Sequence, residues 1–555
     1  MTHDHQIHAP TLDLRGLRLE ARPLSPAGRA LRDTRGLFAP EDVDAQREWY
    51  AALDTLERGL DARPAADSAL RDHLATLPDV ADLLHHLTRC DEALSQAQIF
   101  RLDEWAHHLD AALEHALLAS GAPLLPEPLP AQGKPGGIAA RWHAARCTWR
   151  RHLRPPHHPA GPWRLVDGFD ERLQAPREER RRLERERVRQ RGDARRSLQA
   201  DYGCPVDAQR LLRLPASDPR LTRAHEDPRL EARAASAFEQ TFALVPSADE
   251  RALTSTIDAL DAQIDALEAE VCERCTAGLR SEVHKLTRSY QAGATLDLLY
   301  GLICLKRRWQ GCWPTPGATL RLAGAVLPAL DDALRTRGER CRPLDLSLAP
   351  GATLLTGPNM GGKSVTLQTI ATCTYLALLG YPLPATHAEI PIVRSLYLLQ
   401  GDLADDTEGL SAFGGEVERL RDALNAPEPK LLLLDEWGKS TNPREGSALG
   451  GALLEHLATQ PTLSLYASHL PLAHPTQGGF VALGMVGLAD ADPGLLDADV
   501  QTHGWRAALR RHMRYQLRPL QRADAPAEAL RIAAWAGLPP SLIERAHLGM
   551  QEPSE

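Results

Sequence analysis

A phosphate-binding loop is the clearest chemical feature of the sequence. The eight residues that begin at Gly357 fit the pattern G-x-x-x-x-G-K-[ST], and they stand between an apolar run, Ala352 to Leu355, and the helical pattern that starts at Val365. In such a loop the backbone N–H groups cradle phosphates, the lysine bridges the β- and γ-phosphates, and the hydroxyl holds Mg²⁺. We therefore predict ATP and Mg²⁺ as cofactors, with ATP contacts from Gly357, Pro358, Asn359, Met360, Gly361, Gly362, Lys363, Ser364 and Val365.

Two neighbouring acids are the expected complement of this loop. Asp435 and Glu436 directly follow four leucines, Leu431 to Leu434, and this apolar run predicts a buried central strand. One carboxylate would act on Mg²⁺ through its water shell, with Ser364 as the other metal residue, and the next carboxylate would polarise the attacking water. Either acid alone could be an ordinary charge at a strand end. Beside a phosphate loop, the pair predicts Asp435 as a Mg²⁺ residue and Glu436 as a catalytic residue.

Two further polar residues stand where ATP chemistry could use them. The run Leu463 to Ser468 predicts another buried strand, and His469 at its end would sense the γ-phosphate as a second catalytic residue. A lone histidine at a strand end is more often structural. Ser411 opens a predicted helix with a hydroxyl and backbone amides that suit an anion, although in isolation it could also be only a helix cap.

The elements that must position these residues change character near Thr315. After it, short apolar runs alternate with helical patterns and glycine turns, which predicts a mostly parallel sheet with helices. Before it, apolar residues recur at helical spacing from about Glu41 to Ser120, and a helix begins at a capping box on Ser247. The spacing in that helix alternates between four and three and predicts a packing seam of Leu253, Ile257, Leu260, Ile264, Leu267 and Val271. The region before Thr315 is therefore predicted to be helical throughout.

A strongly charged segment lies within this helical region. Residues 177–196 hold ten Arg against four Glu and one Asp, a local net charge of +5. The segment could lie along a DNA backbone through Arg180, Arg181 and Arg185, because each neutralised phosphate releases counterions and strengthens binding. An exposed helix whose Arg and Glu pair at three- and four-residue spacing is the more ordinary interpretation.

The composition is that of a globular protein with several domains. The 555 residues are 43% hydrophobic and 25% charged, and the formal net charge of −9 confines any nucleic-acid contact to local basic patches. Nine cysteines without framework spacing predict reduced thiols, and Cys272 and Cys275 lack the second pair that a zinc site needs. No apolar run approaches the ~18 residues of a membrane span, and the N-terminus lacks a signal-peptide core. We expect a cytoplasmic protein without a membrane partner.

From about residue 315 to 550 the chain resembles the ATPase domain of the MutS family of mismatch-repair proteins. The motifs that carry the resemblance follow in the family's order: Thr356 to Ser364, then Gly401, Gly409, Ser411, Phe413 and Glu416, then Asp435-Glu436-Trp437-Gly438, Glu445-Gly446 and Ala467-Ser468-His469. The resemblance implies a homodimer or a MutS-like heterodimer in which Ser411 reaches the ATP of the opposite subunit. It also implies that a helical segment near Ala533 to Ala546 packs across the dimer.

The sequence departs from the family pattern around the expected nucleotide base. Gly438-Lys439-Ser440-Thr441 replaces the family's Gly-Arg-Gly-Thr, Leu327 replaces a histidine, and Leu344 replaces an asparagine. Ala412 and Gly414 also alter the signature segment. The resemblance thus implies the phosphate chemistry and leaves the adenine contacts open. Phe169-Asp170-Glu171 matches the letters of the family's mismatch-reading motif, but its position beside the charged segment marks it as coincidence.

The predicted fold class is α plus α/β, in a short family member without the mismatch-reading domain. A long helical region precedes a P-loop NTPase domain of the ABC-like, MutS type and a C-terminal helical segment. The predicted divisions are an N-terminal tail at 1–40, a helical core and lever region at 41–314 that could include a clamp around 140–245, the ATPase domain at 315–520, and a dimerisation segment at 521–555.

Three functions are compatible with these motifs. The preferred hypothesis is a DNA-binding ATPase that converts ATP and water to ADP and phosphate and moves levers on DNA, in mismatch repair or in recognition of a related DNA structure. An alternative is a MutS-like reactivase whose partner is an adenosylcobalamin-dependent aminomutase of the lysine aminomutase type. An ABC-type ATPase is the third, because Ser411 to Glu416 resembles that signature too, but the loop and the C-terminal segment disfavour it.

Overall fold

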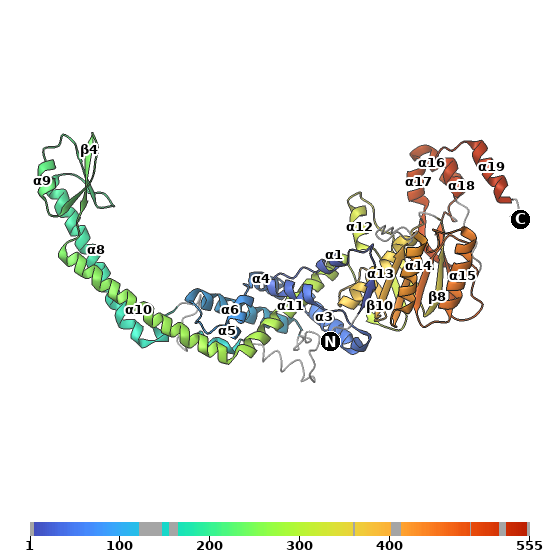
Figure 1. Ribbon diagram of the computed structural model, residues 1–555, viewed down its shortest axis with the longest axis horizontal. Helices are drawn as coiled ribbons and strands as arrows, with labels where there is room; N and C mark the ends of the chain where they lie inside the picture. Colours follow the sequence, from blue (N-terminus) through green and yellow to red (C-terminus); the bar gives the residue numbers. More distant parts are fainter. Residues whose placement is uncertain are drawn as a thin grey trace. The chain divides into compact units, whose positions relative to one another are not determined.

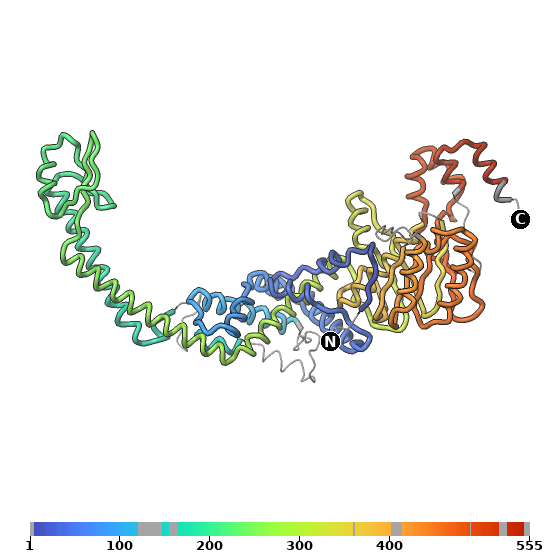
Figure 2. The backbone as a smooth tube through the Cα atoms, viewed as in Figure 1, coloured from blue at the N-terminus to red at the C-terminus, as the bar shows by residue number. Residues whose placement is uncertain are grey.

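The computed structural model describes residues 5–120, 147–154, 165–358, 361–400, 412–488, 490–520 and 529–551 (Figures 1 and 2). Its contacts divide the chain into two compact units. The sheet unit comprises Met1–Leu77, Ala111–Ala144 and Tyr290–Glu555, and the arm unit comprises Pro78–Asp110 and Ala145–Ser289. Among the described helices, none combines the length and the apolarity that a membrane crossing requires.

A seven-stranded sheet of described residues forms the centre of the sheet unit. Its order is β1 (Gln6–His8), β10 (Ser395–Gln400), β11 (Lys430–Asp435), β12 (Leu463–Ala467), β8 (Gly351–Thr356), β13 (Phe480–Gly487) and β14 (Arg514–Pro519). All neighbouring pairs are parallel except β13 and β14. Because β8 and β11 are parallel members of one sheet, the phosphate loop after Thr356 and the acids at Asp435 come to the same edge. The predicted α/β architecture is confirmed.

The central strands are leucine-rich because helices cover both faces of the sheet. Leu431 to Leu434 on β11 are all buried, as expected for a parallel strand with no solvent face. Figure 1 shows α13 (Lys363–Leu379), α14 (Ala412–Asn425) and α15 (Pro443–Ala458) packed along this sheet. A second sheet has the order β5 (Thr315–Pro316), β9 (His387–Ile390), β6 (Leu320–Ala325) and β7 (Leu344–Leu348). The other helices here are α1 (Leu14–Leu19), α2 (Pro26–Thr34), α3 (Val43–Asp61), α4 (Pro64–Thr76), α12 (Pro328–Arg335), α16 (Pro493–His503), α17 (Trp505–His512), α18 (Ala529–Trp535) and α19 (Pro540–Gln551).

The N-terminal 40 residues differ from the predicted tail. Residues 6–8 form β1, the edge strand beside β10, and α1 and α2 follow it. Arg35 Nε donates to the carbonyl oxygen of Leu379 over 2.9 Å, at the end of α13. Just beyond residue 40, Gln46 Nε2 and Trp49 Nε1 donate to the carbonyl oxygens of Ala377 (2.9 Å) and Gly380 (2.8 Å). The tail prediction was wrong for the described part of this segment, because an exposed strand edge and the last carbonyls of a helix both need partners that local sequence patterns do not reveal.

Two long helices dominate the arm unit. They are α8 (Gln174–Tyr202) and α10 (Ala248–Ser281), which lie side by side in Figure 2. The Ser247 hydroxyl accepts a hydrogen bond from the Glu250 N–H, and Ile257, Ile264, Leu267 and Val271 of the predicted seam are buried. The predicted capping residue and the seam are therefore confirmed. The unit also contains α5 (Ala81–Arg89), while α6 (Gln96–Ser120) and α11 (Val283–Trp309) have residues in both units.

A small antiparallel sheet corrects the expectation that everything before Thr315 is helical. Its order is β2 (Leu211–Pro215), β4 (Glu239–Leu244) and β3 (Leu230–Ala235), with α9 (Leu221–Glu226) on one face. Leu212, Leu214 and Phe242 point into a core that also includes Leu198 and Tyr202 of α8. The alternation is only five or six residues long in each strand, and in so short a run the period-2 signal is hard to separate from surrounding helix.

Candidate nucleotide-binding site

The loop between β8 and α13 requires glycine at two positions. Gly357 has φ of 150° and Gly362 has φ of 94°, both in the region that side-chain-bearing residues avoid. A Cβ on Gly357 would lie 2.7 Å from the Met485 Cβ, and one on Gly362 would lie 3.1 Å from the Tyr515 Cδ1. Glycine is therefore favoured at both positions by the closeness of neighbouring side chains as well as by the backbone angle. Asn359 and Met360 lie outside the described residues.

Lys363 is the first residue of α13, and its amine is turned back over the loop. The residue is buried, and its Nζ donates to the carbonyl oxygens of Gly357 (3.0 Å) and Pro358 (3.2 Å). Burial lowers the pKa of Lys363 from its ordinary value, and the nearby Glu436 and Asp435 charges oppose that change. A cation at a helix N-terminus is unfavourable unless an anion joins it. The loop amides, the helix dipole and this amine together fit a phosphate group.

Ser364 and Asp435 form a pair of oxygen groups beside the lysine. Gln400 Nε2 donates to Asp435 Oδ2 over 3.4 Å, and Ser364 is near enough to Asp435 to influence the pKa of its carboxyl. Burial raises the pKa of Asp435, with Ser364 opposing the rise. The described residues contain no cluster of three His, Cys, Asp or Glu that could hold a metal alone. A hydroxyl and one carboxylate fit Mg²⁺, which takes few protein ligands and completes its shell with water and phosphate oxygens.

Glu436 stands at the centre of the charged groups. Its Oε1 lies 4.0 Å from Lys363 Nζ and 3.5 Å from His469 Nδ1, and its Oε2 lies 3.1 Å from Lys439 Nζ. Burial acts to raise the pKa of Glu436, but the hydrogen bond and charge of Lys439, with the charges of His469 and Lys363, lower it overall. The carboxylate is thus kept ionised, as a group that accepts a proton from water must be. The structure brings together Lys363, Ser364, Asp435, Glu436 and His469.

The backbone at Glu436 is in the left-handed region, with φ of 54°. A non-glycine residue there costs roughly 1 kcal/mol or more and persists where neighbouring contacts hold it. The Glu436 N–H donates to the carbonyl oxygen of Ala467 on β12 over 2.9 Å, which fixes the residue between two strands. The motif predicted the residue type at this position but not its conformation.

A cavity of about 1060 Å³ adjoins the first turns of α13. Its walls include Val365, Thr366, Leu344, Arg342 and Tyr515. Leu344, where the sequence departs from the family pattern, is therefore part of the wall of this cavity. Tyr515 and Arg342 were missed at the sequence level. The alternation of β14 is the signal that could have drawn attention to Tyr515, but nothing in the sequence relates that strand to Gly362.

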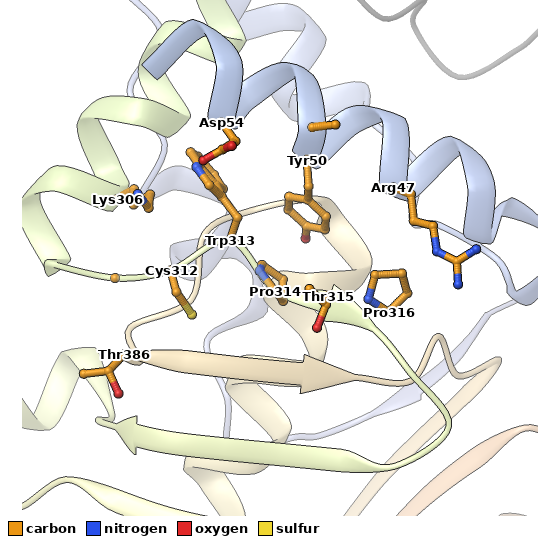
Figure 3. Close-up of a pocket in the computed structure, with 12 residues that line it drawn as sticks. Arg47, Tyr50, Asp54, Lys306, Cys312, Trp313, Pro314, Thr315, Pro316 and Thr386 are labelled. Carbon is orange, nitrogen blue, oxygen red and sulfur yellow. The ribbon is translucent and has the colours of Figure 1, made fainter. Parts of the chain in front are cut away.

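A second pocket of about 520 Å³ lies between α3 and the segment that follows α11 (Figure 3). Figure 3 shows Tyr50 and Asp54 on α3, Lys306 on α11, and Trp313 on the connecting segment. Lys306 Nζ and Trp313 Nε1 both donate to the Glu57 carboxylate, and Asp54 pairs with Arg58. The polar groups at this pocket are satisfied by the chain itself, so we assign no ligand to it.

The remaining predicted residues fall elsewhere. Ser411 lies outside the described residues, and α14 begins at the next residue, Ala412. Arg180 on α8 pairs with Asp261 on α10, whereas Arg181 and Arg185 are exposed and donate to backbone carbonyls of their own helix. Within the described ranges, no carboxylate lies at ion-pair distance from either of these two guanidinium groups.

Comparison with known proteins identifies the family. The family model of MutS domain V matches residues 353–552, which include the loop, both acids and the C-terminal helices. Endonuclease MutS2 of Thermotoga petrophila is 30% identical over 206 residues, 36% of this chain and 26% of that protein. The DNA mismatch repair protein MutS of Ruegeria pomeroyi is 30% identical over 305 residues, 53% of this chain and 33% of that protein. Residues 353–552 of the chain thus match domain V of the MutS family.

The match to the MutS relatives covers only part of their length. The chain spans about a quarter to a third of their length. Endonuclease MutS2 of Gemmatimonas aurantiaca, for example, is 32% identical over 220 residues, which are 38% of this chain and 26% of that protein. The region matched by the MutS domain V model runs from β8 to α19, and the nucleotide loop and the two acids lie within it.

Proposed function

We propose that the chain is a MutS-type ATPase that converts ATP and water to ADP and phosphate. The observation that carries the proposal is the convergence of Lys363, Asp435 and Glu436 at one edge of the sheet, with 4.0 Å between Lys363 Nζ and Glu436 Oε1. The loop amides and Lys363 would hold the phosphates, and Ser364 and Asp435 would hold Mg²⁺. Mg²⁺, when bound, would neutralise charge that develops on the phosphate oxygens.

Different residues of the chain would have different roles in ATP hydrolysis. Glu436 would orient a water molecule and accept its proton, because Lys439, His469 and Lys363 keep the carboxylate ionised. His469, whose Nδ1 is 3.5 Å from Glu436 Oε1, would sense the γ-phosphate and couple its presence to the Glu436 carboxylate. The wall of Leu344, Val365 and Tyr515 would pack against the base largely through apolar and aromatic contact.

We further propose that the working form is a dimer that acts on DNA. The relatives are named for DNA mismatch repair or as endonucleases, and a nucleotide site of this type would be completed by Ser411 of the opposite subunit. Residues 41–314 would act as core and levers, with a clamp around 140–245, and the helices after residue 520 would pack across the dimer. Cytoplasmic localisation stays a prediction.

Two exposed arginines of α8 are the proposed contacts with the DNA backbone. Arg181 and Arg185 are one helical turn apart on the exposed surface, whereas Arg180 is engaged by Asp261 with Nε to Oδ1 at 2.5 Å. We therefore propose Arg181 and Arg185 as the backbone contacts and reassign Arg180 to the junction between α8 and α10.

An ATPase assay with Glu436→Gln tests the catalytic assignment. Loss of the proton acceptor should lower turnover by about 100-fold or more while nucleotide binding stays intact. Glu455→Gln, a change on an exposed residue of α15, is the matched control and should behave as the unsubstituted chain. Undiminished turnover by Glu436→Gln would refute the assignment.

DNA binding is tested by affinity for a duplex at several salt concentrations. Binding should weaken with salt, and the double change Arg181→Ala with Arg185→Ala should lower the slope of log affinity against log salt by about 2. Arg180→Ala is the control and should leave that slope nearly unchanged. Absent binding, or binding that salt does not affect, would exclude this part of the proposal.

A further inference from the structure

A buried glutamate connects α14 to the loop that follows the two acids. Glu416 is 2% exposed, and its carboxylate accepts hydrogen bonds from the Gly438 N–H (3.0 Å) and from the Ser440 hydroxyl (2.7 Å). Its backbone carbonyl oxygen also accepts from Trp437 Nε1 over 3.2 Å. All three contacts go to one short segment, Trp437 to Ser440.

That segment adjoins the proposed catalytic carboxylate in the chain and contacts it. It begins immediately after Glu436, whose left-handed backbone must be held by its surroundings. It also carries Lys439, whose amine lies 3.1 Å from Glu436 Oε2. A shift of the segment would therefore move both the strained residue and its charged neighbour.

Packing alone does not require an acid at position 416. Leu420 and Ala423 of α14 already belong to the apolar core beside β11, together with Trp437. A buried carboxylate is costly unless its oxygens are hydrogen-bonded, and here the two side-chain bonds both go to the Trp437 to Ser440 segment. The hydrogen bonds to Gly438 and Ser440 thus explain why position 416 carries an acid.

We propose that Glu416 is a positioning residue for ATP hydrolysis, which fastens the Glu436 to Ser440 loop to the start of α14. This inference rests on the proposed ATPase function and names a residue that positions its water-activating group. Loss of the Glu416 carboxylate would release the Gly438 N–H and the Ser440 hydroxyl and so disturb the backbone next to Glu436.

The test compares Glu416→Ala with Glu416→Gln. A glutamine amide oxygen can accept from the Gly438 N–H while its NH₂ donates to the Ser440 oxygen, because a hydroxyl both donates and accepts. Alanine makes neither bond. Glu416→Ala should lower kcat by about 10- to 100-fold with the KM for ATP within about 2-fold, and Glu416→Gln should recover most of the loss.

A merely structural role predicts a different pattern, in which ATP binding and thermal stability fall together with kcat. That pattern, or an unchanged kcat in Glu416→Ala, would overturn the inference. Should Glu416→Ala fail to fold, Ser440→Ala gives an independent answer, because Ser440 is exposed and loses only one hydrogen bond. It should lower kcat by several-fold, and an unaltered kcat would again overturn the inference.

The Glu436→Gln assay separates this inference from the proposed function. If the unsubstituted chain does not hydrolyse ATP, the proposed ATPase function itself fails, and if Glu436→Gln retains turnover, the catalytic role of Glu436 fails. If Glu436→Gln stops turnover while Glu416→Ala and Ser440→Ala hydrolyse ATP normally, only the role of Glu416 fails.

Discussion

The site region of the sheet unit and the paired helices of the arm unit differ in the interactions that stabilise each of them. In the sheet unit, leucines of β11 and neighbouring strands form a dry core, and polar side chains gather at one edge where the site lies. In α8, which is described throughout, only Pro176, Leu198 and Tyr202 are buried, and ion pairs join it to α10. Those pairs are Arg177 with Glu268, Arg180 with Asp261, and Arg191 with Glu250. Apolar burial holds the candidate site in a close-packed core, whereas each exposed ion pair adds little stability and is screened by salt.

The largest effect is expected in the core of the sheet unit. Leu433→Ala removes a fully buried side chain from β11 and should lower the free energy of unfolding by about 2 to 5 kcal/mol. Chemical denaturation measures the change. Val481→Ala, on a residue 47% exposed in β13, is the control and should cost far less. Equal costs for the two variants would contradict the contrast between buried and exposed positions.

An intermediate effect is expected at the buried acid of the arm unit. Glu250 is 3% exposed and accepts from Arg210 Nη1 and Arg191 Nε, both over 2.7 Å. Glu250→Ala leaves two guanidinium groups without their acceptor and should lower the free energy of unfolding by about 2 kcal/mol, less than for a fully buried pair because both arginines are partly exposed. Glu231→Ala, which breaks a surface pair with Arg233, should cost much less.

The same residue gives the arm unit an acid dependence of known sign. Burial acts to raise the pKa of Glu250, but hydrogen bonds from Arg210 and Arg191 lower it overall from its ordinary 4.5. A carboxyl whose pKa is lower in the folded chain stabilises the fold above its unfolded pKa, and the stabilisation is lost as pH falls through the folded pKa. Denaturation of the original chain at pH 7 and below pH 4.5 should therefore show a loss that Glu250→Gln reduces. An equal loss in both proteins would exclude Glu250 as its source.

The smallest effect is expected on the exposed face of α8. Arg189 pairs with Glu186 three residues before it, and the arginine side chain is 70% exposed. Arg189→Ala should change the free energy of unfolding by at most about 0.5 kcal/mol, because exposed pairs are screened by water and salt. A cost as large as that of Glu250→Ala would mean that the helix surface contributes more to stability than its exposure indicates.

The sequence by itself determined which residues make up the candidate site and the class of the fold. The spacing of Gly357 to Ser364 and the acids after four leucines depend only on local order along the chain, and local order is what a loop between a strand and a helix requires. The cap at Ser247 and the seam of α10 were predictable for the same reason, since the cap is a contact within one helical turn and the seam is marked by local spacing of apolar residues.

Only the tertiary structure decided the contacts that join distant segments. The pairing of residues 6–8 with β10, the approach of Tyr515 to Gly362, the pairing of Arg180 with Asp261, and the hold of Glu416 on Gly438 each link residues far apart in the chain. No pattern of spacing encodes such contacts, because they depend on which helix or strand ends come together once the core is packed. Residue types along the sequence could thus identify the candidate reacting groups. The residues that orient those groups could be identified only from the packing of distant segments.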